Sequence, residues 1–252
     1  MPETDTDQIF RQVMTSEPPT DDSPFVRATR DFLFGSVWSR PGLSRRDRRW
    51  VTLACVAAAD APGPIDAHVR AALASGDLTL DEMLEFVLQF ACYSGWPKAS
   101  HVEGVVRATW SQLCAEHGDP APEWPVRDDR ELSTPSERIA AGTEEFTAVN
   151  CFPPPPADTP FLHVGMLDFV FGHVWRRPGL SRRDRRLITI GCAGMADAAT
   201  PILMHVGTAL ETGDLTDAEM DEVVLHFTAY AGFPKGAALH ESVQRNRERL
   251  GR

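Results

Sequence analysis

The stretch VWSRPGLSRRDRR, residues 37–49, returns almost unchanged as VWRRPGLSRRDRR at residues 174–186. The offset of 137 residues between them also holds for the flanking sequence, and residues 34–98 and 171–235 are identical at 39 of 65 positions when aligned without gaps. A repeat of this length and identity indicates a duplicated domain, because a short recurring motif would lose its register outside the motif itself.

The segment between the two copies has the composition of a linker. It reads HGDPAPEWPVRDDRELS from His117 to Ser133 and combines prolines with charged residues. We therefore expect a first domain at 1–118, a linker at 119–132 and a second domain at 133–252.

Composition narrows the class of protein. The 252 residues carry a net charge of −11, whereas binding nucleic-acid phosphates needs a basic surface. No apolar run approaches the roughly 18–20 residues of a membrane span, and the first residues lack the basic and apolar regions of a signal peptide. The five cysteines form no CxxC pair, so a zinc ribbon is not indicated. We expect a cytoplasmic protein without nucleic-acid or membrane partners.

Local signals predict helices throughout and no strand with a period of two. Possible capping boxes begin at Ser44, Thr79, Ser181 and Thr216, each with an acidic residue three positions later. The helix after each arginine cluster is rich in Ala, Gly and Cys, and such small side chains allow close helix packing. The pattern favours an all-α fold in which the two copies form a pseudo-two-fold helical bundle with this helix at its centre.

Together these segments resemble the carboxymuconolactone decarboxylase family, within the alkylhydroperoxidase D-like superfamily, twice over. The resemblance rests on FGSVWSRPGLSRRDRRWVTLAC and DAHVRAALASGDLTLDEMLEFVLQFACYSGWP, and on their partners FGHVWRRPGLSRRDRRLITIGC and LMHVGTALETGDLTDAEMDEVVLHFTAYAGFP. It implies a helical protein that self-associates, as a dimer or as a trimer of tandem chains, and acts on a small anionic substrate. It also implies that neither a metal nor an organic cofactor is needed.

The peroxidase branch of that superfamily is disfavoured. Its CxxC stands just ahead of the histidine, where this chain has Ala61 and Pro64 in the first copy and Ala198 and Pro201 in the second. Without a resolving cysteine, a reversible dithiol cycle is not available.

His68 and His205 match the family's active-site histidine and are the first catalytic candidates. Each lies on an apolar helical stripe, so a satisfied core histidine is the alternative. With an ordinary pKa of about 6.5, either histidine could donate or accept a proton near neutral pH. No second histidine or cysteine stands at ligand spacing in that helix, and a metal site is therefore not indicated.

The arginine clusters lie at predicted helix N-termini, where each cation is unfavourable by about 0.3–1 kcal/mol. Something acidic should therefore face them: a carboxylate from the neighbouring copy or chain, or an anionic substrate. Arg48 and Arg185 are the candidates for gripping a substrate carboxylate.

Further candidates occupy equivalent positions in the two copies. Glu85 and Glu222 could orient a histidine or act as a base, or could be solvated helix residues. The tryptophans and tyrosines at Trp38, Trp175, Tyr93 and Tyr230 are expected in the core or in a pocket wall. His101 matches a histidine that family decarboxylases place after the G-x-P turn, but the second copy has Ala238 there; His226 replaces Gln89.

The leading functional hypothesis is a cofactor-independent lyase that decarboxylates a small cyclic or lactone carboxylic acid, with histidine moving the proton. Alternatives are a diverged tailoring enzyme of isomerase, cyclase or dehydratase type, and a non-catalytic binding or scaffold protein. The differences between the copies leave open whether one site or both are active.

Overall fold

A computed structural model describes residues 3–120, 124 and 134–252. Every regular element in these residues is a helix, which confirms the all-α fold. Most of the predicted linker, 119–132, lies outside the described residues, so its boundaries stay a prediction.

The two copies repeat one helix order. The first copy contains α1 (Glu3–Met14), α2 (Pro24–Ala28), the π-helix η1 (Thr29–Trp38), α3 (Arg45–Ala58), α4 (Pro62–Ala74), α5 (Leu80–Ser94) and α6 (Trp96–His117). The second contains α7 (Pro135–Asn150), the π-helix η2 (Phe161–Phe171), the short 3₁₀ helix η3 (Val174–Arg176), α8 (Arg182–Met195), α9 (Ala199–Thr212), α10 (Asp217–Ala231) and α11 (Phe233–Leu250).

The predicted caps start the helices where expected. Ser44 and Ser181 accept hydrogen bonds from the backbone N–H three residues later, at the first turns of α3 and α8. Thr79 and Thr216 form complete capping boxes at α5 and α10. The sequence signals therefore place the start of each arginine-bearing helix correctly.

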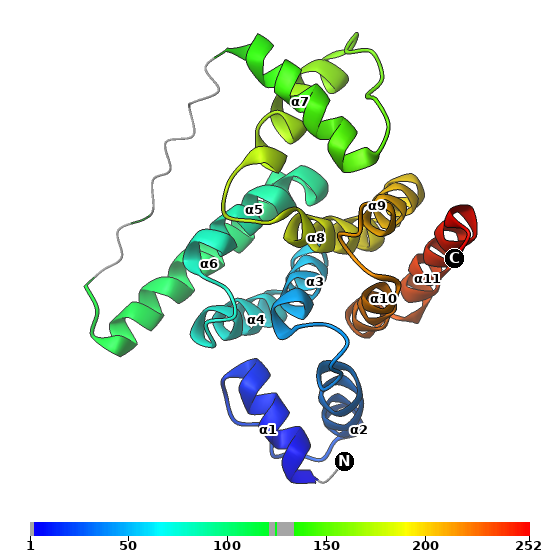
Figure 1. Cartoon of the computed structure of the whole chain (residues 1–252). Coiled ribbons are helices and arrows are strands. Elements are labelled where there is room, and N and C mark those ends of the chain that lie inside the picture. The colour runs from blue at the N-terminus through cyan, green and yellow to red at the C-terminus, as the bar shows by residue number, and fades with distance from the viewer. Residues whose placement is uncertain (1–2, 121–123, 125–133) are drawn as a thin grey trace.

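The centre of the molecule is the crossing of α3 and α8, with the remaining helices of each copy to either side (Figure 1). A Cβ added at Gly191 would stand 2.8 Å from the Cβ of Ala54, which is closer than real Cβ atoms approach. The small residues of α3 and α8 thus let the two backbones meet, and one apolar core runs through both copies.

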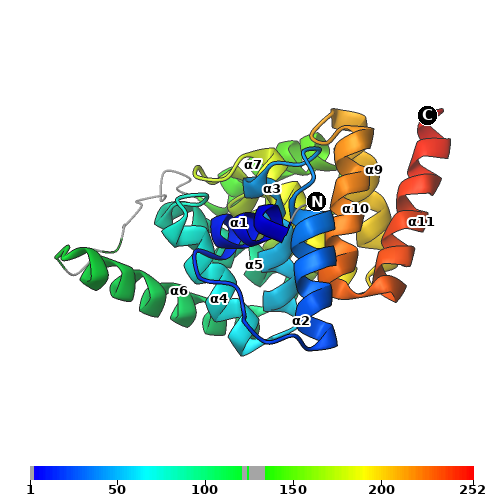
Figure 2. The same cartoon turned by 90° about the horizontal axis from the view of Figure 1, so that it is seen from below.

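Two smaller apolar clusters lie outside this core. One joins α1 and η1 around Val13, Phe34 and Trp38; the other joins α7 and η2 around Phe146 and Trp175. The helices that carry them lie at opposite ends of the molecule, and the view from below shows α1 lying across the first copy (Figures 1 and 2). Each copy therefore carries a separately packed pair of helices, which we call its cap: α1 with η1 in the first copy and α7 with η2 in the second.

Candidate functional site

The two candidate histidines are buried against the opposite copy. His68 on α4 is 7% exposed and its ring lies 5.4 Å from that of Tyr230 on α10. His205 on α9 is 6% exposed and lies 5.7 Å from Tyr93 on α5. Each tyrosine hydroxyl accepts a hydrogen bond from a tryptophan of the histidine's own copy, at 2.9 Å from Trp38 and 3.0 Å from Trp175.

An arginine completes each group. We call His68, Trp38, Arg49 and Tyr230 the first cluster, and His205, Trp175, Arg186 and Tyr93 the second cluster. The guanidinium carbon of Arg49 lies 5.3 Å from the Trp38 ring centroid, and that of Arg186 lies 5.5 Å from Trp175, both within cation–π range. Both arginine side chains are fully buried.

The caps reach these arginines through the backbone. Arg49 donates from Nη2 to the carbonyl of Val13 near the end of α1, and Arg186 does the same to Val149 near the end of α7. Their Nε atoms donate to Asp77 at 3.1 Å and Asp214 at 3.0 Å. Arg49 and Arg186 thus each link a cap to a cluster, because the guanidinium that lies in the cluster also binds the backbone of α1 or α7.

The clusters differ in how arginine meets histidine. Nη1 of Arg186 lies 3.2 Å from Nδ1 of His205. In the first cluster, Nη1 of Arg49 and Nδ1 of His68 are both buried without a hydrogen-bond partner among the described residues. The arginine–histidine contact of the second cluster is therefore not made in the first.

Burial and the neighbouring arginine keep both histidines neutral. Desolvation, followed by the positive charge of Arg49, lowers the pKa of His68 to about 3, and desolvation with Arg186 lowers the pKa of His205 to about 3. An arginine N–H can only donate, so Nδ1 of His205 accepts and the ring proton resides on Nε2. The structure thus differs from the sequence expectation of an ordinary pKa near 6.5, which assumed a solvated ring.

The tyrosines are also neutral at physiological pH. Burial raises the pKa of Tyr230 to about 12, against the opposing effect of hydrogen bonds with Trp38 and Thr52. Burial likewise raises the pKa of Tyr93 above its usual value. Each cluster therefore holds a buried arginine, ion-paired with an aspartate, beside neutral hydrogen-bonding groups.

The two candidate glutamates pair with arginines of the other copy. Glu222 accepts from Nε of Arg40 at 2.7 Å and from Nη2 of Arg48 at 2.9 Å. Glu85 accepts from Nη2 of Arg177 at 2.8 Å. In the described part of the chain no hydrogen bond joins either glutamate to His68 or His205. Burial alone would raise the pKa of Glu222, but the bonds from Arg40 and Arg48 outweigh it and hold that pKa below its usual value.

Arg48 and Arg185 belong to buried hydrogen-bond networks beside the two clusters. Arg185 donates from Nη1 to Oε1 of Gln89 at 2.9 Å, and Nε2 of Gln89 donates to Thr189 at 3.1 Å. In the other copy, Arg48 lies 3.5 Å from Nδ1 of His226, and Nε2 of His226 lies 2.7 Å from Thr52. His226 therefore makes the same two contacts as Gln89, with its ring nitrogens in place of the amide atoms.

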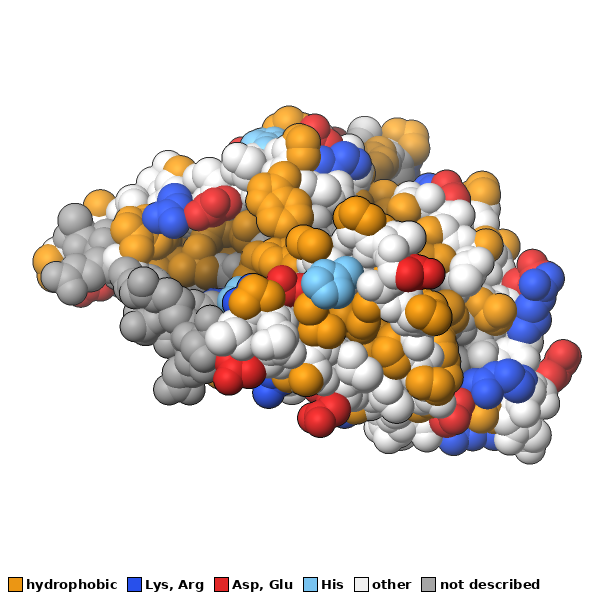
Figure 3. Space-filling model, turned by 90° about the horizontal axis from the view of Figure 1, so that it is seen from above, with side chains coloured by type: hydrophobic (Ala, Val, Ile, Leu, Met, Phe, Trp, Pro, Cys, Tyr) orange, Lys and Arg blue, Asp and Glu red, His pale blue; other side chains and the backbone are white. Residues whose placement is uncertain are grey.

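Arg46 and Arg183 of the repeated stretch bind across the interface between the copies, whereas Arg45 and Arg182 pair with Asp77 and Glu145 of their own copy. Arg46 lies 3.2 Å from Asp184, and Arg183 lies 3.0 Å from Asp47. Trp50 also donates to Asp184, at 2.7 Å. These pairs confirm the expectation that carboxylates of the neighbouring copy face the arginines. Accordingly, basic side chains on the face in Figure 3 stand scattered towards its edges.

His101 lies apart from both clusters. It is exposed on α6, and its Nδ1 lies 2.8 Å from Asp60. The structure thus brings His68 together with Trp38 and Tyr230, and His205 together with Trp175 and Tyr93. It assigns Glu85, Glu222, Arg48, Arg185 and His226 to the surrounding buried network and leaves His101 at the surface.

Sequence reasoning passed over Arg49 and Arg186 as site residues. The sequence pattern favours their neighbours Arg48 and Arg185 instead. Because the repeats align without gaps, Arg48 and Arg185 have an equally regular spacing to the histidines, so spacing alone gives no signal for Arg49 and Arg186.

Neither a metal-ligand cluster nor a membrane-spanning helix is found among the described residues. They contain no group of three or more His, Cys, Asp or Glu side chains arranged to hold a metal ion. None of their helices combines the length and the hydropathy that crossing a bilayer requires.

Comparison with known proteins agrees with this duplicated architecture. The model of the carboxymuconolactone decarboxylase family matches residues 23–108 and 163–241. The 4-carboxymuconolactone decarboxylase of Acinetobacter baylyi is 39% identical over 73 residues, covering 29% of this chain and 54% of that protein. The nitrosuccinic acid decarboxylase of Metarhizium robertsii is 37% identical over 79 residues, covering 30% of this chain and 54% of that protein.

The chain thus spans about half the length of these two relatives. The two regions that match the family model are equivalent parts of the two copies and together make up more than half of the chain. The chain belongs to the carboxymuconolactone decarboxylase family, and carries two tandem copies of its domain.

Proposed function

We propose that this protein is a decarboxylase of a small carboxylic acid and that the first and second clusters are its sites. The observation that carries the proposal is the buried pairing of arginine with neutral histidine, as in Arg186 and His205 at 3.2 Å. Both curated relatives are named as decarboxylases, which supports the reaction class at the family level.

The chemistry requires two kinds of group. Loss of carbon dioxide leaves an electron pair on the α-carbon, which delocalises onto an adjacent acceptor oxygen and is later protonated. The guanidinium of Arg49 or Arg186 would bind a carboxylate of the substrate. The Nε2–H of a neutral histidine would donate a hydrogen bond to the oxygen that gains charge, a role that neutral imidazole can fill in a water-poor site.

This role differs from simple proton delivery by an imidazolium. With a pKa of about 3, His68 and His205 are uncharged at neutral pH and act as hydrogen-bond donors or as bases. The proton that finally reaches carbon would then come from water or through this imidazole, while its ring proton is replaced from solvent.

A binding or scaffold protein is the second candidate. The observation that favours it is the packing of the histidines, since His205 lies edge-on to Tyr93 and stacks on Trp175 with ring centroids 6.1 Å apart. Such packing also describes a core residue, and the two candidates differ in whether removing the imidazole abolishes turnover or only lowers stability.

The test measures carbon dioxide release from 4-carboxymuconolactone and from nitrosuccinate. His68→Leu, His205→Leu and the double variant keep side-chain volume while removing the donor; His240→Leu, at an exposed position of α11, is the matched control. We expect the double variant to lose about 100- to 1,000-fold in kcat, as for removal of one oxyanion-type donor. Arg186→Lys should raise KM more than it lowers kcat, because an ammonium group cannot keep the contacts to Asp214, His205 and Val149 and also bind a carboxylate.

The single variants locate the working cluster. Turnover lost in one of them assigns the activity to that cluster, and turnover roughly halved in each assigns it to both. Folded wild-type protein that releases no carbon dioxide from either acid would contradict decarboxylation of these two acids. An unimpaired double variant would contradict the histidine role.

A further inference from the structure

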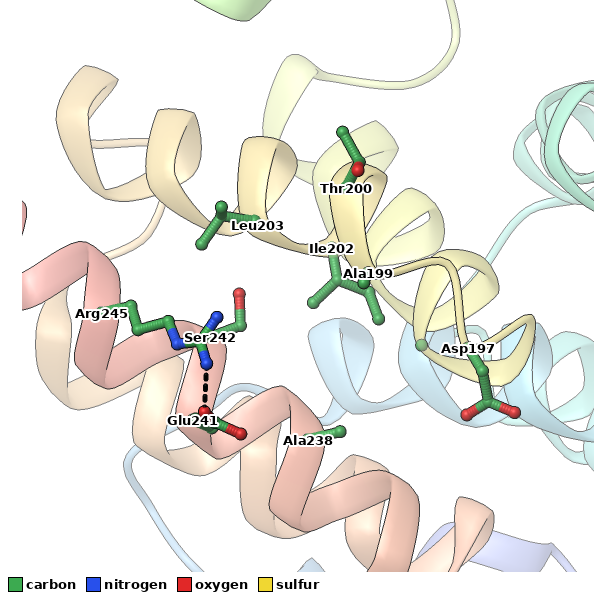
Figure 4. A pocket seen from close by; sticks show the side chains of 10 residues that line it. Asp197, Ala199, Thr200, Ile202, Leu203, Ala238, Glu241, Ser242 and Arg245 are labelled. Carbon is green, nitrogen blue, oxygen red and sulfur yellow. Dashed lines mark hydrogen bonds and ion pairs between the residues drawn. The ribbon is translucent and has the colours of Figure 1, made fainter.

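A groove between α9 and α11 lies on the side of α9 away from the copy interface. Its volume is about 490 Å³, within the range of small-molecule sites. The close-up in Figure 4 shows Ile202 and Leu203 on α9 facing Ala238 and Ser242 on α11. Neither cluster contributes a residue to its lining, so the groove is separate from the proposed sites.

A buried hydroxyl group in this groove has no partner. Ser242 is 8% exposed, and its Oγ makes no hydrogen bond among the described residues. In Figure 4 this hydroxyl points into the space between the two helices. Helix serines commonly bond to the carbonyl one turn earlier, so an unsatisfied, buried hydroxyl here indicates that its partner comes from outside the chain.

The lining of the groove is largely specific to the second copy. Comparison of the repeats shows that Ser242 replaces Val105, Ala238 replaces His101 and Leu203 replaces Asp66. These substitutions supply the hydroxyl, shorten a side chain at the rim and make the wall apolar. Of the ten lining residues, only Asp197 and Ile202 match the first copy, whereas the repeats as a whole agree at 39 of 65 positions.

The charges around the groove are already neutralised. Arg245 pairs with Glu241 one turn away on α11, and Lys235 at the start of α11 pairs with Asp197. A charged ligand would have to displace one of these pairs, whereas an uncharged ligand would not. The walls therefore favour a neutral molecule.

We propose that this groove binds a small, uncharged and mostly apolar molecule whose single hydroxyl or carbonyl oxygen hydrogen-bonds to Ser242. Ile202, Leu203 and Ala238 provide the apolar contact. The volume is several times that of a cavity that holds one benzene ring, so the groove accommodates a molecule larger than a single ring, and the buried hydroxyl fixes its orientation.

The test uses p-cresol as probe and toluene as its counterpart without the oxygen. Methyl NMR of protein labelled at Ile and Leu follows Ile202 and Leu203 during titration. We expect saturable shifts with p-cresol and at least ten-fold weaker binding of toluene. Ser242→Val, which copies the first repeat, should remove the difference between the two probes while leaving the packing intact.

A second pair of variants separates the groove from the rest of the surface. Ala238→His also copies the first repeat, where the equivalent imidazole pairs with Asp60, and the new imidazole can reach Asp197. It should narrow the groove beside Ser242 and weaken the binding of both probes. Ala237→His, at an exposed neighbouring position that does not line the groove, should leave binding unchanged.

Three outcomes would overturn the proposal: no saturable shift with p-cresol, equal binding of p-cresol and toluene to the wild type, or undiminished binding to Ala238→His. The Leu203→Asp variant supplies a further check by sedimentation. If p-cresol does not bind and this variant reduces the oligomer size, the groove is a contact between copies of the chain. Binding is measured without turnover, so the result is independent of the proposed decarboxylase activity.

Discussion

The indole Nε1 of Trp38 donates a hydrogen bond of 2.9 Å to the hydroxyl of Tyr230, although 192 residues separate them. Trp175 and Tyr93 form the equivalent bond in the other direction between the copies. Each cluster is therefore assembled from both repeats, with the histidine and tryptophan from one and the tyrosine from the other.

This bond makes the tyrosine hydroxyls important for stability. Tyr230→Phe or Tyr93→Phe would leave a buried indole N–H unpaired, and we expect each change to cost about 1–3 kcal/mol in the free energy of unfolding. Urea unfolding measures this loss. Trp38→Phe in the Tyr230→Phe background is the control, because the second change should cost less than it does in the wild type. Fully additive losses would contradict the pairing.

The buried histidines predict a specific loss of stability in acid. The pKa of His68 and His205 is about 3 in the folded state and about 6.5 in the unfolded chain, so the unfolded chain binds protons first as the pH falls. The contribution of the neutral histidines to the free energy of unfolding is complete above pH 6.5. Between pH 6.5 and pH 3 it decreases by about 1.4 kcal/mol per pH unit for each histidine. Urea unfolding at pH 7, 6 and 5 should show a shallower decline for His68→Leu/His205→Leu than for the wild type. Identical declines would show that the rings bind protons equally in the folded and unfolded chain, and would contradict the lowered pKa.

The tyrosines predict a change at the alkaline end. The pKa of Tyr230 is about 12 in the folded state, above its ordinary value near 10, so the protonated form is favoured by folding. The resulting contribution of Tyr230 to the free energy of unfolding is complete below pH 10 and is lost as the pH rises towards 12. Absorbance at 295 nm should therefore show little tyrosinate at pH 10.5 in folded protein and abundant tyrosinate in urea, since these are the chain's two tyrosines.

The equivalence of Gln89 and His226 predicts an asymmetric substitution pattern. His226→Gln should keep both contacts, to Arg48 and Thr52, and change the free energy of unfolding by less than about 1.5 kcal/mol. His226→Ala should cost about 2–5 kcal/mol, because it leaves a cavity and an unpaired buried guanidinium N–H. Thermal unfolding of both variants measures the difference. Equal losses would show that the ring itself, and not its hydrogen bonding, is required.

Replacing a glycine by alanine should have opposite effects at the α3–α8 crossing and at an open position of α6. Gly191→Ala would bring a methyl group within 2.8 Å of the Cβ of Ala54 and should destabilise the protein by about 1–3 kcal/mol through overpacking. Gly104→Ala, on α6, meets no atom within 4 Å and should stabilise it by up to about 1 kcal/mol through helix propensity. Differential scanning calorimetry of the two variants should show shifts of Tm in opposite directions.

Much of the fold could be predicted from sequence because its determinants are local or repeated. The capping residues at Ser44 and Thr79 fix where helices begin, and the repeat offset of 137 residues reveals the duplication. The π-helical form of η1 and η2 was not foreseen, since hydrophobic periodicity does not distinguish helix types over ten residues.

The composition of the clusters depends on contacts that sequence spacing does not encode. Arg48 and Arg49 are adjacent, yet successive helix residues point about 100° apart, so Arg48 meets Glu222 whereas Arg49 meets Trp38. Which of the two faces the histidine is decided by how α3 packs against α10 and η1. The partnership of His68 with Tyr230 likewise follows from the docking of two distant helices.

Each repeat supplies the tyrosine for the cluster that holds the other repeat's histidine, and this has a consequence for the evolution of the gene. A substitution in α10 alters the surroundings of a histidine encoded in the other half of the gene, and a substitution in α5 does the reverse. Although duplication usually frees one copy to drift, neither half here can change at its tyrosine without altering the cluster whose histidine the other half carries. The two repeats are thus inherited as one unit, and separating them into two chains would require both to be retained together.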